Sequence, residues 1–219
     1  MTTTPRRGAD RAALRHQEHH EPKPERRAAV LTPEQLARML ELASPRDAAL
    51  LAVMGAGACR IGEALLLCWA DIDATGRVVI PAQCTKTGRS RAFTLPPQAL
   101  GYLEHWRQLC PPSQAGWLFP GSPVRHPLSV RAGQRAIQRL AAAAGVQGVS
   151  SHSLRRSALT TAHQAGLGLR ALAEMSGHQS LLELQRYLAG DAFRAEADAA
   201  RALLFQAATQ PAIENQLQP

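Results

Sequence analysis

Residues 48–54 are almost wholly apolar, and they follow the helix-start signal Ser44-Pro45-Arg46-Asp47. A serine N-cap with proline at the first helical position favours a helix that begins here. A helix that is apolar on every side must be buried among other elements. Because Gly55-Ala56-Gly57 follows the apolar run, we expect the helix to end there and to form the centre of a single core.

Further start and stop signals divide the rest of the chain into mostly helical elements. Thr32-Pro33-Glu34-Gln35 combines an N-cap, a proline and a capping-box glutamine, which predicts another helix. Helices are also expected over residues 60–69, 96–110, 131–144, 151–165, 170–176, 180–188 and 192–208. Residues 77–80 and 91–95 indicate two strands joined by a turn at Gly88. The expected fold class is therefore α+β, mainly α, with a small antiparallel sheet.

Length and composition predict one domain over residues 30–208, with a flexible basic arm at 1–29 and a tail at 209–219. The chain has 219 residues, of which 45% are hydrophobic and 19% charged, so it is too apolar for disorder. No uncharged stretch is long enough for a membrane span, and no apolar region follows the first arginines as in a signal peptide. We expect a cytoplasmic protein with no membrane partner.

The four cysteines, Cys59, Cys68, Cys84 and Cys110, include no C-x-x-C pair and are expected to be buried thiols. A zinc site would need a second cluster of ligands, and the one candidate, His16 with His19 and His20, lies in the polar arm. We therefore expect no metal and no cofactor.

The basic charge is concentrated in the middle of the chain. Residues 74–173 contain twelve arginines or lysines and a single acid, Glu104. Carboxylates would repel phosphates, so a stretch with so few acids suits a nucleic-acid surface, although a solvated basic face would have the same composition. Arg131, Arg135 and Arg139 recur every four residues on one expected helix and favour contacts with phosphates. Double-stranded DNA is the partner we expect.

Lys86 is unusual in a chain whose 25 basic residues include 23 arginines. The only other lysine, Lys23, lies in the arm. An ammonium group, with an ordinary pKa of about 10.4, can be tuned to release its proton, whereas a guanidinium stays charged. Lys86 is therefore a candidate proton donor within the basic region.

Four fragments stand in order along the chain: Gly57-Ala58-Cys59-Arg60-Ile61-Gly62-Glu63, Thr85-Lys86-Thr87-Gly88-Arg89-Ser90-Arg91, His152-Ser153-Leu154-Arg155-Arg156, and Gly177-His178 with Tyr187 nine residues beyond the histidine. Together they resemble the tyrosine recombinases, the phage integrase family. In that family an arginine at a helix start, a hairpin lysine, an H-x-L-R box, a G-H pair and a later tyrosine form one active site. Departures from the family pattern are Cys59, Gly62, Arg156 and Ser176, the last standing where leucine is usual.

The resemblance assigns a role to each residue of this set. Tyr187 would attack phosphorus and hold the DNA 3′ end as a phosphotyrosine, which conserves the bond energy for rejoining. Arg60 and Arg155 would bind the phosphate oxygens, and Lys86 would protonate the leaving 5′ oxygen. His152 and His178 would serve as phosphate ligands and proton relays, with Glu63 as a buttress. The DNA contacts expected besides the arginine stripe are Arg89, Arg91 and Arg156.

The implied function is a site-specific recombinase that cleaves and rejoins double-stranded DNA in integration, inversion or dimer resolution. The chain resembles a catalytic domain alone, similar in architecture to the short fimbrial-type DNA invertases. The resemblance implies a homomultimer, a tetramer on DNA, whose subunits dock through helix 192–208. The N-terminal arm or an accessory DNA-binding protein would help to hold the DNA. The expected location is the nucleoid in the cytoplasm. Two alternatives stay open: a DNA-relaxing enzyme like type IB topoisomerases, and a non-catalytic DNA-binding accessory protein.

Overall fold

The computed structural model describes residues 28–111 and 116–188. The described elements follow in this order: α2 (Pro33–Glu41), α3 (Pro45–Ala56), α4 (Ile61–Leu65), η2 (Trp69–Asp71), β1 (Arg77–Ile80), η3 (Ala82–Cys84), β2 (Arg91–Thr94), α5 (Pro97–Leu109), α6 (Val130–Ala143), α7 (Ser151–Gln164), α8 (Leu169–Ser176) and α9 (Leu181–Tyr187). The expected fold class, mainly helical with a small antiparallel sheet, is confirmed.

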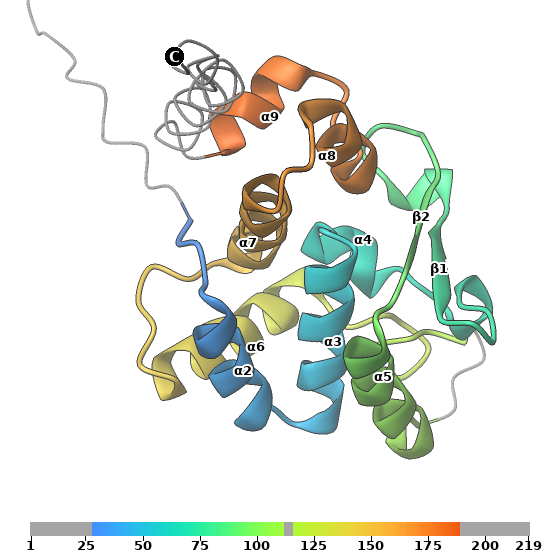
Figure 1. Ribbon diagram of the computed structural model, residues 1–219. Coiled ribbons are helices and arrows are strands. Elements are labelled where there is room, and N and C mark those ends of the chain that lie inside the picture. The colour runs from blue at the N-terminus through green and yellow to red at the C-terminus, as the bar shows by residue number, and fades with distance from the viewer. Residues whose placement is uncertain (1–27, 112–115, 189–219) are drawn as a thin grey trace, which may run out of the picture.

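Helix α3 is the centre of the larger of two packed groups of elements (Figure 1). It contacts α2, α4, α5, α6 and α7, and its residues from 47 to 54 are all buried. The Ser44 side chain accepts the backbone N–H of Asp47, as the start signal predicts. The prediction of a central helix that ends near Gly57 is therefore confirmed.

Helix α2 has the predicted capping box, in which Thr32 and Gln35 each accept the other's backbone N–H. Helix α4, in contrast, is shorter than predicted, because it ends at Leu65 and a separate turn of 3-10 helix covers Trp69–Asp71. The carboxylate of Asp71 accepts the backbone N–H of Cys68 at 2.8 Å. This local bond stabilises a separate 3-10 turn that begins after Cys68, in place of one continuous helix.

Strands β1 and β2 pair antiparallel, and Ile80 lies opposite Arg91 while Val78 lies opposite Phe93. Val78 and Ile80 are fully buried on the core side of this hairpin. Gly88, in the connection between the strands, has a φ of 65°, which an L side chain rarely adopts. The predicted two-stranded sheet and its glycine turn are both confirmed.

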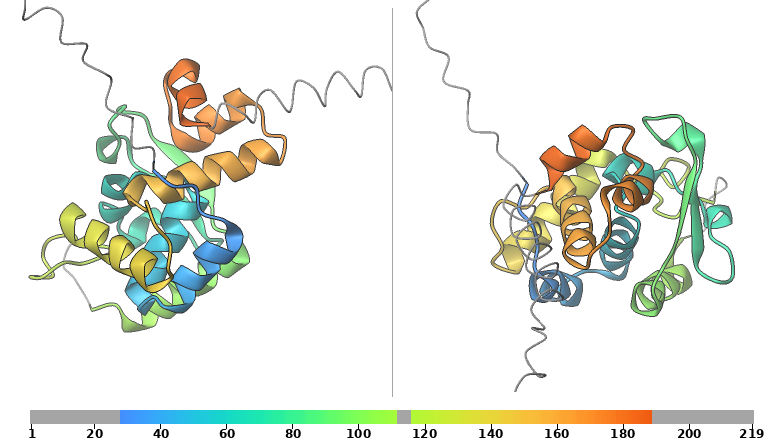
Figure 2. Two further views of the ribbon diagram at one scale, coloured as in Figure 1. Left: turned by 90° about the vertical axis from the view of Figure 1, so that its left-hand side faces the viewer. Right: turned by 45° about the horizontal axis from the view of Figure 1, so that its top comes forward.

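Helices α7, α8 and α9 build a second, smaller apolar cluster. Its buried members include Leu159 of α7, Leu172 of α8, Leu184 of α9 and Leu188, which directly follows α9. Figures 1 and 2 show α8 and α9 together at one end of the molecule, next to α7. Ala58 packs with this cluster, whereas the adjacent Cys59 packs with the larger core. The turn before α4 therefore lies where the two groups meet.

The last two residues of the predicted arm are held against the domain. The backbone N–H of Ala29 donates to the carbonyl of Gly148, and the carbonyl of Ala28 accepts from Arg156. The remaining arm residues, helix 192–208 and the tail 209–219 lie outside the described residues. Residues 28 and 29, which lie before the predicted start of the domain at residue 30, are therefore hydrogen-bonded to it.

Only Cys59 of the four cysteines is buried, so the expectation of buried thiols is wrong for Cys68, Cys84 and Cys110, which are partly exposed. These three lie at element ends, where the chain turns at the surface. All four are free thiols. Within the described ranges, no helix combines the length and apolarity needed to cross a membrane.

Gly57 should tolerate no side chain. A Cβ at this position would overlap the ring of Phe93 and come within 2.6 Å of the Cys59 sulfur. We expect Gly57→Ala to destabilise the fold by about 2 kcal/mol, as overpacked cores do. Gly55→Ala is the matched control, because nothing lies within 4 Å of its Cβ and alanine favours the helix. Urea unfolding midpoints measure both, and equal midpoints would contradict the expected overlap.

Candidate active site

Arg60 is held at the start of α4 by Glu63, three residues further along the helix. The Glu63 carboxylate accepts the Arg60 backbone N–H at 3.0 Å and the Arg60 Nη1 at 2.8 Å. The Arg60 side chain keeps 30% of its surface exposed, whereas that of Glu63 keeps 4%. A buried carboxylate thus holds a guanidinium that stays partly exposed, an arrangement that fits the buttress role expected of Glu63.

Glu63 also holds a second guanidinium, that of Arg91 at the start of β2. Arg91 Nη2 lies 2.6 Å from Glu63 Oε2. Burial by itself would raise the pKa of Glu63, but the hydrogen bonds from Arg60 and the charge of Arg91 hold this pKa below its ordinary value. Glu63 is therefore ionised and joins two arginines from different elements.

Arg91 points into the protein, and this placement corrects its prediction as a DNA contact. Its Nη1 donates to the carbonyls of Gly57 at 2.7 Å and Met175 at 3.0 Å, while Nη2 donates to Glu63. The side chain is only 10% exposed. A guanidinium with these contacts connects α4, β2 and the end of α8, so Arg91 positions the site instead of binding phosphates.

Arg155 lies within α7 and is 1% exposed. Its Nη1 donates to the carbonyl of Ala58 at 2.7 Å, and its Nη2 lies 3.2 Å from His178 Nε2 and 3.4 Å from Nδ1. Ala58 has a φ of 46°, a conformation that is costly for a residue other than glycine. The strained turn before Arg60 therefore directs a carbonyl at the buried Arg155, as strain at functional sites often does.

His178 follows Gly177, whose φ of 71° ends α8 in the left-handed conformation. Burial first, and then the charges of Arg155 and Arg60, lower the pKa of His178 to about 4. Glu63 opposes this shift and Arg91 adds to it. The imidazole is therefore neutral at physiological pH.

His152 lies in the first turn of α7 and is exposed. Its pKa is also lowered, by partial burial of the ring and by the charges of Arg155 and Arg60. Both arginines thus act on both histidines, so the four groups share one small region. The structure brings together Arg60, His152 with Arg155, and His178, which come from three separate segments of the sequence.

Lys86 is exposed in the loop between η3 and β2. The next residue, Thr87, accepts a hydrogen bond through its carbonyl from the side chain of Gln179 at 3.5 Å. Gln179 follows His178 directly. The loop that carries Lys86 therefore lies beside the G-H pair, with its ammonium on the solvent side.

Tyr187 is the last residue of α9, and the position of its side chain lies outside what the structure describes. Leu184 and Leu188, which flank it along the chain, are fully buried in the cluster formed with α7 and α8. The segment that carries Tyr187 is therefore anchored on the helices that hold Arg155 and His178.

The other predicted DNA contacts divide into outward and inward groups. Arg89, Arg131 and Arg135 are exposed. Arg139 is 71% exposed along its side chain, although its Nη2 lies 3.4 Å from the buried Asp47 carboxylate. Arg156, predicted to bind DNA, instead donates to the carbonyl of Ala28 at 2.7 Å, which secures the chain entering the domain.

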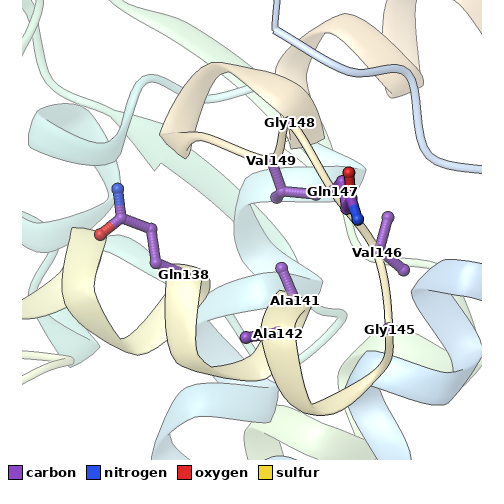
Figure 3. A pocket seen from close by; sticks show the side chains of 8 residues that line it. All are labelled: Gln138, Ala141, Ala142, Gly145, Val146, Gln147, Gly148 and Val149. Atoms are coloured by element: carbon purple, nitrogen blue, oxygen red, sulfur yellow. The ribbon is translucent and has the colours of Figure 1, made fainter.

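An open hollow of about 420 Å³ lies elsewhere, between the end of α6 and the loop that leads to α7 (Figure 3). Its walls are small apolar and amide residues: Gln138, Ala141, Ala142, Gly145, Val146, Gln147, Gly148 and Val149. None of the predicted site residues lines it, so the hollow is separate from the arginine and histidine cluster.

Residues 29–193 match the sequence model of the phage integrase family. The chain belongs to this family. A putative integrase/recombinase, y4eF, of Sinorhizobium fredii (strain NBRC 101917 / NGR234) is 31% identical over 169 residues, 76% of this chain and 66% of that protein. The tyrosine recombinase XerC of Bifidobacterium longum (strain DJO10A) is 33% identical over 156 residues, 66% of this chain and 43% of XerC.

The fold is also that of solved recombinases. The crystal structure of XerA recombinase superposes with a TM-score of 0.69 at 22% identity, over 79% of this chain and 65% of XerA. The chain thus spans less than two thirds of the length of the relatives and the solved structure compared here.

Sequence reasoning missed the positioning role of Arg91 in this family member. The signal was the two-residue period of β2, in which Arg91 and Phe93 are partly buried while Ala92 and Thr94 are exposed. An arginine that shares a strand face with a core phenylalanine points inward. The alternation of buried and exposed residues along β2, and not the charge of Arg91, indicates that the Arg91 side chain points inward.

We expect the titration midpoint of His178 to lie near pH 4, far below the ordinary 6.5. Between these values the unfolded chain binds a proton that the folded chain rejects, so the free energy of unfolding falls as the pH drops from 6.5 to 4. NMR titration of the assigned His178 ring measures the midpoint. Arg60→Gln removes one nearby charge and should raise it, whereas a wild-type midpoint at or above 6.5 would contradict the description of the site.

Proposed function

We propose that this protein is a site-specific tyrosine recombinase that cleaves and rejoins double-stranded DNA through a 3′-phosphotyrosine intermediate. The observation that carries the proposal is the meeting of two guanidiniums, Arg60 and Arg155, with His152 and His178. Such a set of fixed donors suits the charge that grows on phosphate oxygens in a transesterification. Membership in the phage integrase family and the similarity to XerC support the same chemistry.

In the proposed reaction the Tyr187 oxygen attacks phosphorus, and the bond between phosphorus and the 5′ oxygen breaks. Arg60 and Arg155 donate to the nonbridging oxygens and supply charge without acting as bases. Lys86 gives a proton to the leaving 5′ oxygen, which becomes a hydroxyl. Attack by a 5′ hydroxyl on the phosphotyrosine reverses these steps and rejoins the strand.

The DNA would lie across the exposed arginines of α6, namely Arg131, Arg135 and Arg139, and near Arg89 of the hairpin loop. Two features favour this path: the four side chains are exposed, and residues 74–173 contain a single acid. We further propose that the enzyme acts on nucleoid DNA in the cytoplasm as a homomultimer, a tetramer, docked through residues 192–208. Residues 1–29 or an accessory DNA-binding protein would supply the remaining contacts that hold the duplex.

A nicked suicide substrate tests the nucleophile. The wild-type protein should form a covalent protein–DNA adduct on its recombination site, and Tyr187→Phe should form none because the attacking oxygen is gone. Tyr102→Phe is the matched control, since Tyr102 is the only other tyrosine and lies exposed on α5. Denaturing gels measure the adduct.

The same assay separates the alternatives. An adduct that depends on Tyr102, or one that persists in Tyr187→Phe, would overturn the assignment. Absence of any adduct across candidate sites would favour the DNA-binding accessory protein. Relaxation of plasmids of any sequence by a monomer would favour the enzyme like type IB topoisomerases.

The role of Lys86 is tested by changing the leaving group. Lys86→Arg keeps the charge but holds its proton too firmly, so it should bind DNA normally and cleave at least about tenfold more slowly, in the range of lost acid catalysis. A substrate with sulfur in place of the 5′ bridging oxygen needs no proton and should restore the rate. Equal cleavage of the ordinary oxygen substrate by both proteins would remove the general-acid role.

A further inference from the structure

Ser176 is a fully buried residue at the C-terminal end of α8, next to the G-H pair. Its Oγ lies 2.6 Å from His178 Nδ1, 2.7 Å from the carbonyl of Leu172 and 3.4 Å from that of Ala173. The family resemblance places leucine at this position, so the hydroxyl is a feature of this chain. It contacts Nδ1 of His178, while Arg155 Nη2 lies almost equally far from both ring nitrogens, at 3.2 and 3.4 Å, which places it over the ring.

The contacts of Ser176 select one arrangement of protons. Its Oγ has two close neighbours, His178 Nδ1 at 2.6 Å and the carbonyl of Leu172 at 2.7 Å, and the hydroxyl carries a single proton. The carbonyl can only accept, so the hydroxyl proton is donated to it. The proton of the neutral ring is then on Nδ1 and is donated to Ser176 Oγ.

The reverse arrangement leaves one short contact without a proton. With the ring proton on Nε2, Ser176 would have to donate to Nδ1. Its Oγ would then lie 2.7 Å from the carbonyl oxygen of Leu172 with no proton between the two oxygens. It would also lose a hydrogen bond that is common for a serine one turn later in a helix.

We propose that Ser176 is a positioning residue that keeps the proton of neutral His178 on Nδ1, so that Nε2 is the unprotonated nitrogen of the ring beside Arg155. Its part in cleavage rests on the function proposed above. A bound phosphodiester adds negative charge beside Nε2 and favours the uptake of a proton there from solvent. Ser176 then accepts from a cationic ring, which is a stronger, charge-assisted bond, and Nε2–H donates to a phosphate oxygen.

The tautomer can be read without DNA by correlating the ring nitrogens and carbon-bound protons of His178 in NMR spectra. The wild-type protein should show one form, protonated on Nδ1. Ser176→Ala removes the acceptor, so its spectrum should report a mixture of the two tautomers. Ser157→Ala is the matched control, because Ser157 is also buried and bonds to a carbonyl one turn earlier, that of Ser153, but it has no contact with His178.

Cleavage of the suicide substrate gives a second reading. Ser176→Ala should slow the single-turnover cleavage rate about tenfold, as loss of a residue that orients a functional histidine does elsewhere, with DNA affinity unchanged. Ser176→Thr keeps the hydroxyl and should restore both the tautomer and most of the rate. If the alanine variant does not fold, Ser176→Cys keeps nearly the same volume with a poor acceptor and carries the same test.

Two outcomes would overturn the proposal. Wild-type His178 protonated on Nε2, or a pure Nδ1 form in the variants that lack the hydroxyl, would remove the tautomer role of Ser176. A mixed tautomer with unchanged cleavage would remove its role in the reaction. Failure of the wild type to form any adduct would instead reject the proposed function, and the NMR result would still decide the contact between Ser176 and His178.

Discussion

The buried carboxylate of Glu63 is the interaction on which the arrangement of the site depends. An ionised carboxylate costs several kcal/mol to bury unless cations compensate it. Arg60 compensates it from the start of the same helix, and Arg91 does so from β2. Because Arg91 also binds the carbonyls of Gly57 and Met175, pairing with Glu63 draws the hairpin and the end of α8 toward the Arg60 turn. One buried charge thus joins three separate parts of the chain.

The turn before α4 is the second constraint, because two successive carbonyls in it hold two guanidiniums. Gly57 accepts from Arg91, and Ala58, in its left-handed conformation, accepts from Arg155. Ala58 packs with the cluster of α7, α8 and α9, and Cys59 packs with the core around α3. Any shift between these two groups would therefore separate His178 from Arg60. The packing of two apolar clusters sets the geometry of a polar site.

Local sequence signals predicted most of the helices and strands, and motifs indicated several of the site residues. Thr32 and Ser44 cap their helices within three residues, and the apolar run after Ser44 could only be a buried helix. The resemblance to the phage integrase family likewise placed Arg60, Arg155 and His178 in one expected site. The inward roles of Arg91 and Arg156 were not predictable from charge, because their acceptors lie between 28 and 128 residues away along the chain. An arginine in a basic stretch has the same composition whether it faces DNA or a backbone carbonyl.

By itself, the sequence determined where most helices and strands begin and end and which residue types can stabilise a phosphate, since caps, periodicity and side-chain chemistry act over a few residues. The tertiary structure decided which of the basic groups turn inward, that Arg155 contacts the ring of His178, and that Ser176 contacts its Nδ1. These outcomes depend on desolvation and on hydrogen bonds between segments far apart in the chain. Such contacts exist only once the two apolar clusters have packed and removed the alternative partner, water.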